Sequence, residues 1–518
     1  MTDVFAPGSS SVVGSVSGDL ECDVAVIGSG MGGATFAAAL SASGARVLVL
    51  EQGDFLPREL QNWDLKAIHL DHRYQNSDPW VDQDGHEYIP ATYHYVGGAT
   101  KFYGATLPRF REMDFGVVEH PDGLSPEWPL TYADLEPYYA RAEEMYFVHG
   151  TRGEDPSEAW RSTDYPFPAV PHEPTIEAFA ETARSQGLTP FHLPQAIDLR
   201  EGGRCLRCGF CDATPCMVDA KGDAEISALR PALESPSVKL LTRAKVVKLR
   251  TDGSGRQVTE AVVSRDGQTH SVRAGRFVVA AGAVNTAALL LRSRSDSHPT
   301  GLSNASGQLG RNFMLHTTSF FVAIDPRRKN STVYQKTLGL NDWYAAGPSN
   351  RYPLGNVQGL GKIQGTTIKN ARRWVPLPIL EGVTKRTLDL FVQTEDLPLA
   401  ENTITINGSD RVVVRRRPTN LSSHRELVSR LKSLAKRAGY PIVVHQELGS
   451  EATAHQCGTA RMGLTGADSV VDRDGQSHDV RNLSIVDSSV FPSSAAVNPA
   501  LTVAAFALRA AESPAFVH

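Results

Sequence analysis

The sequence predicts an α/β protein in which a Rossmann-like dinucleotide-binding domain is interleaved with an α+β domain built on an antiparallel sheet. A β-branched-rich segment, residues 21–28 (ECDVAVIG), runs into a glycine-rich turn and a helix of small residues, and a second short strand ends on Glu51. Residues 277–281 (FVVAA) repeat the pattern of a buried strand followed by glycine. From about residue 317 to 454, apolar and polar residues alternate, which is typical of antiparallel strands.

The glycine-rich turn has the spacing of a dinucleotide-binding fingerprint, G-x-G-x-x-G. Gly28 permits a tight turn, Gly30 lets a pyrophosphate approach the backbone, and Gly33 lets the helix pack closely on the strand. Glu51, about twenty residues further on, is placed to accept hydrogen bonds from a ribose. The motif does not distinguish NAD from FAD. The cofactor contacts predicted in this segment are Gly28, Ser29, Gly30, Met31, Gly33 and Glu51.

Length and composition limit the remaining possibilities. A chain of 518 residues is long enough for two or three domains, and 41% hydrophobic and 21% charged residues are ordinary for an enzyme. The net charge of −5 argues against nucleic acid or an anionic membrane as a partner. No apolar run approaches the ~18 residues of a membrane-spanning helix. Residues 1–20 lack the features of a secretory signal, so we expect a flexible N-terminal tail and a cytoplasmic protein.

The C-terminal part of the chain contains a distinctive helix start. Asn498 is a good N-cap residue, Pro499 suits the first helical position, and residues 500–504 continue as an apolar helix. A helix N-terminus presents free N–H groups and partial positive charge, so it stabilises a group that becomes anionic during a reaction. A reduced flavin is such a group. An ordinary buried C-terminal helix is the alternative interpretation.

Four segments resemble motifs of the glucose–methanol–choline (GMC) oxidoreductases and follow that family's order. They are VGGATKFYGA, EWPLTYADLEPYYARAE, HQCGT and VDSSVFPSSAAVNPALT, and together they span nearly the whole chain. The resemblance implies FAD as the cofactor. The asparagine at position 498 resembles that of pyranose oxidases, cholesterol oxidases and bacterial glycoside 3-oxidases, and the VGG loop is most similar to that of pyranose oxidase. Phe102 occupies the position that matches the flavin-linked histidine of pyranose oxidase, so FAD is expected to bind noncovalently.

The resemblance also implies which residues form the active site. Oxidation of an alcohol needs a base for the hydroxyl proton and an acceptor for the hydride, which the flavin supplies. His455 is the expected base, because the ordinary pKa of histidine lies near neutral pH, and Asn498 is expected to hold the same hydroxyl. His316 is interpreted as a structural histidine, and residues 415–417 (RRR) as a solvated edge-strand run. The further cofactor contacts that the resemblance implies are Gly98, Thr100, Val246, Ala281, Asp487 and Asn498.

Four cysteines lie close together in the segment CLRCGFCDATPC. Cys205, Cys208, Cys211 and Cys216 give the spacing C-x2-C-x2-C-x4-C, which differs from a ferredoxin pattern by one residue in the last gap and suits an iron–sulfur cluster. Zinc is less well matched, because its usual C-x2-C pairs are separated by a longer loop. Reduced structural thiols or local disulfides are the remaining interpretation. No metal is assigned.

These observations favour an FAD-dependent oxidase that converts a secondary ring hydroxyl of a glucoside, C-glycoside or pyranose sugar to a ketone. Carbon-3 is the favoured position, and O₂ is the expected acceptor, which would give H₂O₂. One alternative is an FAD/iron–sulfur sugar or alcohol dehydrogenase that passes electrons to a quinone or protein. Another is an electron-transfer flavoprotein without an alcohol substrate.

The expected domains are discontinuous in sequence, because both ends of the chain carry cofactor motifs. The FAD-binding domain is expected to comprise residues 21–110, 196–310 and 455–518. The substrate-binding domain is expected to comprise residues 111–195 and 311–454.

Overall fold

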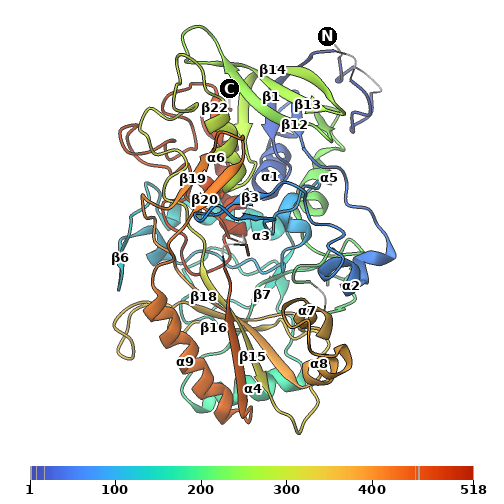
Figure 1. The fold of residues 1–518 in the computed structure, drawn as a ribbon, viewed down its shortest axis with the longest axis vertical. Coiled ribbons are helices and arrows are strands. Elements are labelled where there is room, and N and C mark those ends of the chain that lie inside the picture. Colours follow the sequence, from blue (N-terminus) through green and yellow to red (C-terminus); the bar gives the residue numbers. More distant parts are fainter. Residues whose placement is uncertain are drawn as a thin grey trace.

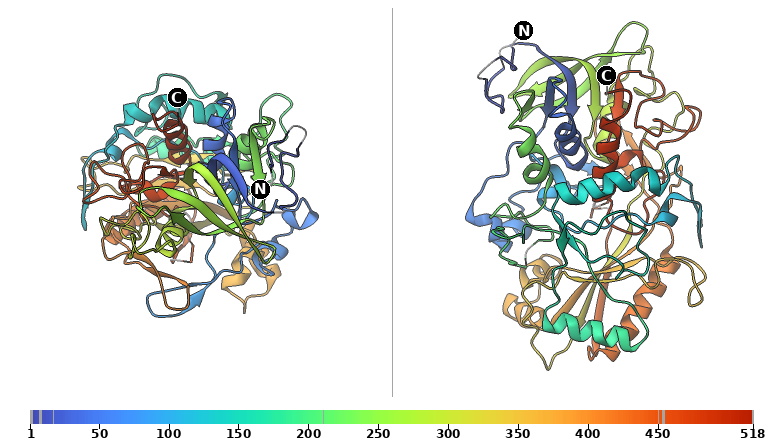
Figure 2. Two further views of the ribbon diagram at one scale, coloured as in Figure 1. Left: turned by 90° about the horizontal axis from the view of Figure 1, so that it is seen from above. Right: turned by 180° about the vertical axis from the view of Figure 1, so that it is seen from behind.

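The computed structural model describes residues 3–6, 9–16, 18–209, 211–449, 451–452 and 455–516, and for residues 370 and 371 it describes the backbone only. The chain forms two stacked parts, each built on its own large sheet (Figure 1). The upper part in that view contains both the first strands and the last helix of the chain. Figure 2 shows helix α3, Tyr132–Met145, lying across the junction of the two parts.

The upper sheet has seven strands of mixed orientation. Its central strands β1 and β14 are parallel, and β2, β11 and β22 extend the parallel region. Strands β12 and β13 turn back on β14 as an antiparallel meander. Aliphatic residues fill β2 and the second half of β1, as strands covered on both faces require. This architecture confirms the predicted α/β class. The strands are β1 Leu20–Ile27, β2 Val47–Leu50, β11 Val238–Leu241, β12 Lys245–Thr251, β13 Val258–Arg265, β14 Gln268–Val279 and β22 Leu483–Ile485.

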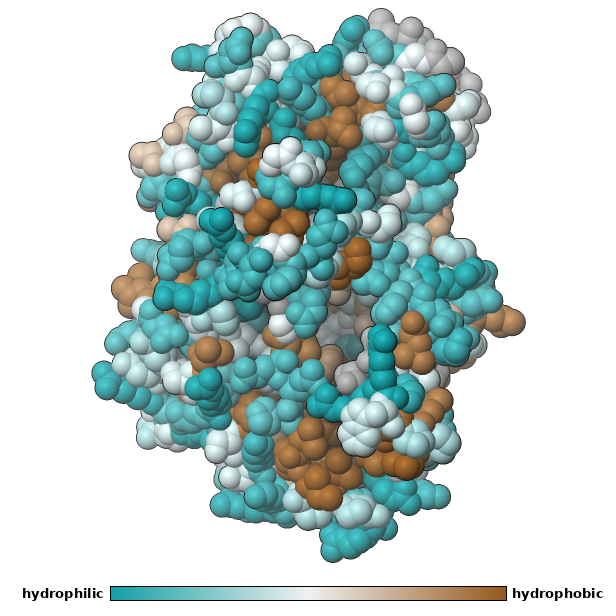
Figure 3. Space-filling view, viewed as in Figure 1, coloured by the Kyte–Doolittle hydropathy of each residue, from teal (hydrophilic) through white to brown (hydrophobic). Residues whose placement is uncertain are grey.

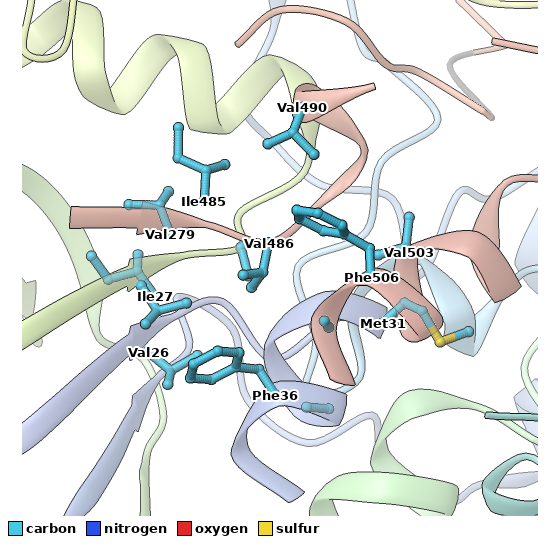
Figure 4. Close-up of a cluster of buried hydrophobic side chains, with 14 of the residues drawn as sticks. Val26, Ile27, Met31, Phe36, Val279, Ile485, Val486, Val490, Val503 and Phe506 are labelled. Atoms are coloured by element: carbon cyan, nitrogen blue, oxygen red, sulfur yellow. The ribbon is translucent and has the colours of Figure 1, made fainter. Parts of the chain in front are cut away.

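Three helices join the two ends of the chain in one core. Helix α1 (Met31–Leu40) packs on α10 (Ala500–Ala511), and α10 packs on α3. Figure 4 shows apolar side chains from β1, α1, β14, β22 and α10 meeting in one cluster. Gly32 permits the close approach, because a Cβ at this position would overlap the backbone oxygen of Val486. The C-terminal segment is therefore fixed against the glycine-rich turn.

The lower sheet is antiparallel, with the strand order β21-β15-β18-β17-β16-β9. Helix α9 (Leu421–Arg437) packs on β15 and β18 and contacts α4 (Pro174–Ser185), and these elements enclose a second apolar core. In Figure 3, an apolar area lies over the lower part of the molecule in front of this sheet. The strands are β9 Phe191–His192, β15 Thr317–Ile324, β16 Leu338–Leu340, β17 Asn356–Gly359, β18 Thr387–Thr394 and β21 Ile442–Glu447.

A separate small sheet, in the order β19-β20-β3-β4, contacts helix α6 (Ala283–Arg292) of the upper part. We expected NTITI and RVVVRRR to share one sheet with TSFFVAI and TLDLFVQ, but only the last two segments pair in the lower sheet. Alternation of apolar residues predicts a strand but does not specify the strand with which it pairs. The partner of β20 here is β3, which lies in the segment that follows β2. The strands are β3 Trp80–Val81, β4 Glu87–Tyr88, β19 Thr403–Ile406 and β20 Val412–Arg415.

The remaining described elements are short. Among the described residues, no helix combines the length and apolar character needed to cross a bilayer. The short helices are η1 Leu60–Trp63, α2 Leu65–His69, η2 Gly98–Lys101, η3 Glu112–Phe115, η4 Glu225–Leu229, α5 Arg230–Ala232, α7 Gly365–Ala371, α8 Leu377–Thr384 and η5 Ser488–Val490. The short strands are β5 Val118–His120, β6 Gly123–Ser125, β7 Val148–Gly150, β8 Phe167–Pro168 and β10 Gln195–Ala196.

Part of the expected flexible tail is bound to the upper sheet. The N–H of Val13 donates to the carbonyl of Leu240 at 2.8 Å, and the N–H of Leu240 donates to the carbonyl of Ser11 at 2.9 Å. Both bonds join the tail to β11, the strand at the edge of the sheet. The buried side chain of Val13 adds apolar contact. Residues 11–13 therefore extend the sheet.

The arginine run after β20 is not uniformly solvated. Arg415 and Arg417 are exposed, but the Arg416 side chain is only 5% exposed and its Nε donates to Oδ2 of Asp396 at 2.9 Å. Asp396 is fully buried and also accepts hydrogen bonds from Thr419. The assignment of Arg416 to solvent was wrong, because the chain leaves the strand at Arg415 and turns the next side chain inward.

Replacing Arg416 with alanine should lower the free energy of unfolding by about 3–5 kcal/mol, because it leaves the buried Asp396 carboxylate without its cation. Arg415→Ala is the matched control and should change the same quantity by less than about 0.5 kcal/mol. Urea unfolding of both variants checks the difference. Equal stability of the two variants would show that the Arg416–Asp396 pair does not stabilise the fold.

Candidate active site

The glycine-rich turn after β1 forms a backbone cradle. Gly28 has a φ of +102°, and a Cβ there would overlap the carbonyl oxygen of Ala280. A Cβ on Gly33 would overlap the carbonyl oxygen of Gly28, so only glycine allows this packing. A Cβ on Gly30 would meet no protein atom within 4 Å. The cradle thus leaves room at its second glycine, where a pyrophosphate approaches the backbone in dinucleotide folds.

The VGG loop lies directly against this cradle. The N–H of Gly97 donates to Oγ of Ser29 at 3.1 Å, and a Cβ on Gly98 would lie 3.1 Å from the Cα of Gly30. Thr100 donates through Oγ1 to the carbonyl of Gly97 at 2.5 Å, which holds the loop in its turn. Two glycine-rich segments that are distant in sequence therefore form one surface.

Two buried carboxylates hold the backbone around the cradle. Oε2 of Glu51 accepts from the N–H of Ser29 at 3.1 Å and from its hydroxyl at 2.6 Å. Oδ2 of Asp487 accepts from the N–H of Gly282 at 2.9 Å and from the hydroxyl of Thr286 at 2.5 Å. Burial raises the pKa of both carboxyl groups. Contacts of Glu51 with a ribose and of Asp487 with a flavin stay predictions.

Three other predicted cofactor residues lie on elements near the cradle. Met31 is the first residue of α1, and Ala281 follows β14, where its N–H donates to Oγ1 of Thr286 at 3.2 Å. Val246 lies at a register irregularity of β12. Direct contact of these residues with a cofactor stays a prediction.

The two predicted catalytic residues come together. Nδ2 of Asn498 lies 3.3 Å from Nε2 of His455, which is partly exposed and has a φ of +64°. Helix α10 begins at Ala500 with Pro499 in the N-cap position, and no side chain caps it. The expected N-cap role of Asn498 was therefore wrong. Its amide instead points into the site just before the helix.

His316 lies behind His455 and contacts its ring nitrogen. The Nδ1 atoms of the two rings are 3.0 Å apart, and Nε2 of His316 is 3.1 Å from the carbonyl oxygen of Ser494. A carbonyl can only accept, so Nε2 of His316 carries a proton. In the neutral ring Nδ1 then accepts from His455 Nδ1–H, which leaves Nε2 of His455 without a proton. His316 therefore contacts the predicted base, and its burial and its hydrogen-bond partners also fit the structural role that the sequence indicated.

The surroundings favour the neutral form of both histidines. Burial lowers the pKa of His316, and burial lowers that of His455 well below its ordinary value. The neighbouring His316 and the ammonium of Lys336 lower the pKa of His455 further. A neutral His455 with a free Nε2 has the state that a general base requires at neutral pH.

Comparisons with known proteins identify the family to which the chain is similar. The sequence pattern described as GMC oxidoreductase matches residues 131–318 and 398–507, and that of an NAD(P)-binding Rossmann-like domain matches residues 26–83. The chain is 32% identical to paromamine 6'-oxidase of Streptomyces fradiae, across 95% of this chain and 91% of that protein. It is 31% identical to 6'''-hydroxyparomomycin C oxidase of Streptomyces lividus, across 94% and 90%.

The chain belongs to the GMC oxidoreductase family. It is also 27% identical to the fructose dehydrogenase large subunit of Gluconobacter japonicus, across 95% of this chain and 98% of that protein. The fold is similar to that of pyridoxine 4-oxidase from Mesorbium loti, with a TM-score of 0.66 and 20% identity over 96% of this chain and all of that one. The family and the predicted fold are therefore confirmed.

As a GMC oxidoreductase, the protein acts on the CH–OH group of a sugar or alcohol and uses FAD. The open space at Gly30, the facing backbone of Gly98 and the two helix starts near them fit a dinucleotide. When bound, FAD supplies the hydride acceptor. The protein supplies the base and the hydrogen bonds that hold the alcohol.

The cysteine segment is tied to the VGG loop by a buried lysine. Nζ of Lys221 donates to four backbone carbonyls, at 3.2 Å to Lys101, 2.8 Å to Tyr103, 2.8 Å to Cys211 and 2.7 Å to Thr214. All four thiols are free. In the described part of the chain, Asp82, Asp84 and His86 are the only three potential metal ligands whose atoms lie within 4.8 Å of one another. The thiols are thus not arranged for a single tetrahedral zinc ion, whose sulfurs lie at ~2.3 Å from the metal.

Sequence reasoning did not single out Gln393 and gave His316 only a structural role. Both are buried, and Oε1 of Gln393 lies 3.0 Å from Nδ1 of His316. In the sequence, Gln393 is one of the polar residues of a strand in which polar and apolar residues alternate, so nothing in its local pattern indicates a functional role. The signal for His316 was its place in the GRNFMLH segment, where the chain leaves the upper part for β15.

Two glycine variants should separate the cradle's packing from its ligand contact. Gly33→Ala should destabilise the FAD-free protein by about 1–3 kcal/mol, because its Cβ would overlap Gly28. Gly30→Ala should leave that stability unchanged and weaken FAD binding about tenfold or more, which corresponds to ~1.4 kcal/mol. Thermal unfolding of the apoprotein and FAD titration by flavin fluorescence measure the two effects. Unchanged FAD affinity in Gly30→Ala would contradict the assigned position of the cofactor.

Proposed function

We propose that this GMC oxidoreductase is an oxidase of a sugar or glycoside hydroxyl that holds FAD noncovalently and reduces O₂ to H₂O₂. The observation that carries the proposal is the pairing of a neutral histidine base with an asparagine amide at the start of α10. Similarity across nearly the whole chain to two proteins named as oxidases of aminoglycosides supports O₂ as the acceptor.

In this proposal His455 Nε2 takes the proton of the substrate hydroxyl. The contact with His316 supports that role, because a hydrogen bond donated by His455 Nδ1–H to Nδ1 of His316 would leave Nε2 of His455 free to take a proton. Asn498 Nδ2, 3.3 Å from Nε2, would donate to the same hydroxyl oxygen and hold it beside the base. The N-terminus of α10, which follows directly, presents partial positive charge to a group that becomes anionic.

Noncovalent binding of FAD is supported by the surroundings of Phe102. Its ring stacks on Tyr93, with centroids 3.7 Å apart and planes at 9°, and it packs with Tyr74 in a small apolar cluster. A phenylalanine offers no atom for a covalent bond to the flavin. We also propose a cytoplasmic location, because free thiols like those of the cysteine segment persist in reducing compartments.

Two positions of oxidation are supported by different observations. The asparagine at 498 and the VGG loop resemble those of oxidases acting at a ring secondary hydroxyl, and they favour carbon-3 of a glucoside or C-glycoside. The names of the two Streptomyces relatives favour an exocyclic carbon-6 hydroxyl of an aminosugar. Oxidation at carbon-3 gives a ketone and oxidation at carbon-6 gives an aldehyde, so the product distinguishes them.

A dehydrogenase that passes electrons through an iron–sulfur cluster is the second candidate function. It is favoured by the spacing of the four cysteines and by similarity to the fructose dehydrogenase large subunit. In the structure, sulfurs of this segment accept backbone hydrogen bonds from Arg207 and Ala220 at 3.4 and 3.3 Å. Such bonds are compatible with cluster ligands, whose sulfurs are commonly hydrogen-bonded, and with free thiols.

Removing the base should stop chemistry without removing the cofactor. His455→Ala and Asn498→Ala should each retain FAD, and flavin reduction by substrate should slow by about 100-fold or more in His455→Ala, within the usual range for loss of a general base. His445→Ala, an exposed histidine on β21, is the matched control. Anaerobic rapid mixing with the substrate measures reduction. Flavin reduction at an unaltered rate in His455→Ala would exclude His455 as the base. That result would favour an electron-transfer flavoprotein, which would need neither His455 nor Asn498.

The purified protein should show a flavin spectrum without iron and should release peroxide with a sugar. Phenyl glucosides and an aminoglycoside with a free 6'-hydroxyl are the substrates to compare, and NMR of the product distinguishes a 3-ketone from a 6-aldehyde. Stoichiometric iron, broad absorbance near 400 nm and turnover only with an artificial dye would instead establish the dehydrogenase.

A further inference from the structure

Gln393, on strand β18, contacts both halves of the site. Its Nε2 is 3.3 Å from Oδ1 of Asn498, and its Oε1 is 3.0 Å from Nδ1 of His316. The side chain is fully buried. Gln393 is thus joined through its side chain to the same two residues, Asn498 and His316, that His455 contacts. The orientation of this one amide therefore affects the asparagine and the histidine pair together.

A chain of amides determines which way Gln393 points. Its Nε2 also donates to Oδ1 of Asn356 at 3.1 Å, and Nδ2 of Asn356 donates to Oδ1 of Asn341 at 2.7 Å. Nδ2 of Asn341 donates to Oδ2 of Asp155 at 2.8 Å. Asp155 carries an ion pair with Arg111, so its carboxylate is an acceptor only. Each amide in turn must direct its nitrogen toward Asp155 and its oxygen toward the site.

The consequence for Asn498 is a fixed orientation. Since Gln393 presents N–H groups, Asn498 must turn its Oδ1 toward Gln393 and its Nδ2 toward His455. An asparagine turned the other way would offer an acceptor to Nε2 of His455 and would stabilise a proton on that nitrogen. His455 would then have no free lone pair for a substrate hydroxyl.

We propose that Gln393 is a positioning residue, oriented by the chain Asn356–Asn341–Asp155, that turns the Asn498 amide so that Nε2 of His455 stays unprotonated. The inference rests on the proposed function of His455 and Asn498. When His455 Nε2 takes the substrate proton, the proton between the two Nδ1 atoms can move from His455 to His316, and His316 Nδ1–H can then donate a hydrogen bond to Oε1 of Gln393, 3.0 Å away. The network of hydrogen bonds is thus better satisfied once the base has acted.

The charges around the pair come from several elements. Glu395 and Asp396 follow β18 and favour a protonated His316, while Lys336, which pairs with Asp212, disfavours a protonated His455. Asp396 is bound by Arg416, and Glu395 accepts from His120 and Ser125. Because Gln393 is uncharged, replacing it with an apolar side chain tests orientation and leaves these charges in place.

The test is the tautomer of His455 in the FAD-containing enzyme labelled with ¹⁵N-histidine. At pH 8 the native protein should show His455 with its proton on Nδ1, identified by loss of the signal in His455→Ala. Gln393→Met, which preserves the length of the side chain, should raise the fraction with the proton on Nε2 to a third or more. Flavin reduction by a substrate should slow at least tenfold in the same variant. Asn402→Leu removes a buried amide that bonds the backbone of Arg417 and should leave both readings unchanged.

Asn341→Leu is the second variant, because it interrupts the chain two amides away from Asn498 and keeps Gln393 itself. It should shift the tautomer in the same direction and decides the question if Gln393→Met loses FAD. An unchanged tautomer in Gln393→Met with FAD bound, or in Asn341→Leu, overturns the proposal. If no sugar or alcohol reduces the native flavin, the proposed function fails, while the tautomer measurement still decides the role of Gln393.

Discussion

The close packing of α1 against α10 is the contact on which the rest of the molecule depends. Gly32 has no room for a Cβ beside the backbone of Val486, so the C-terminal chain passes within van der Waals distance of the first helix. This approach places the start of α10 beside the first glycine-rich turn. A site made of residues from both ends of the chain therefore requires a residue without a side chain at this position of α1.

The active site is then completed from the lower sheet. His316 stands at the beginning of β15, and Gln393 lies near the end of its antiparallel neighbour β18, where it is paired with Thr318. His455 and Asn498 come from the segments that return to the upper part. The hydrogen bonds among these four residues therefore cross from one part of the molecule to the other. The residues that we propose to hold the alcohol are therefore held in position by contacts from both parts.

Local chemistry made much of the fold predictable. Gly28 and Gly33 are required by contacts within a few residues or with the neighbouring strand, so their spacing alone identifies the turn. Helix α9 is likewise amphipathic, ends at Arg437 and is followed closely by Gly439, which has a φ of +88°. In both cases the cause of the structure lies in adjacent sequence.

Long-range partners explain what the sequence did not reveal. Arg416 is buried because it forms an ion pair with Asp396, which lies 20 positions earlier in the chain. Asn498 does not cap the helix, because its amide is hydrogen-bonded to Gln393 and His455. The family resemblance supplied His455 and Asn498, but the polarity of the amides behind them depends on Asp155, a residue in an unrelated loop. A contact between residues so far apart in the chain leaves no periodic pattern or fixed spacing in a single sequence, so it could not be predicted.

The strand-like pairing of residues 11–13 with β11 has a practical consequence for handling this protein. These residues cover hydrogen-bonding groups that β11 would otherwise present at the margin of the upper sheet. A shortened version beginning at Leu20 would expose that margin to a second molecule, and exposed margins of sheets template intermolecular association. The segment that we expected to be part of a flexible tail therefore covers part of the edge of the upper sheet.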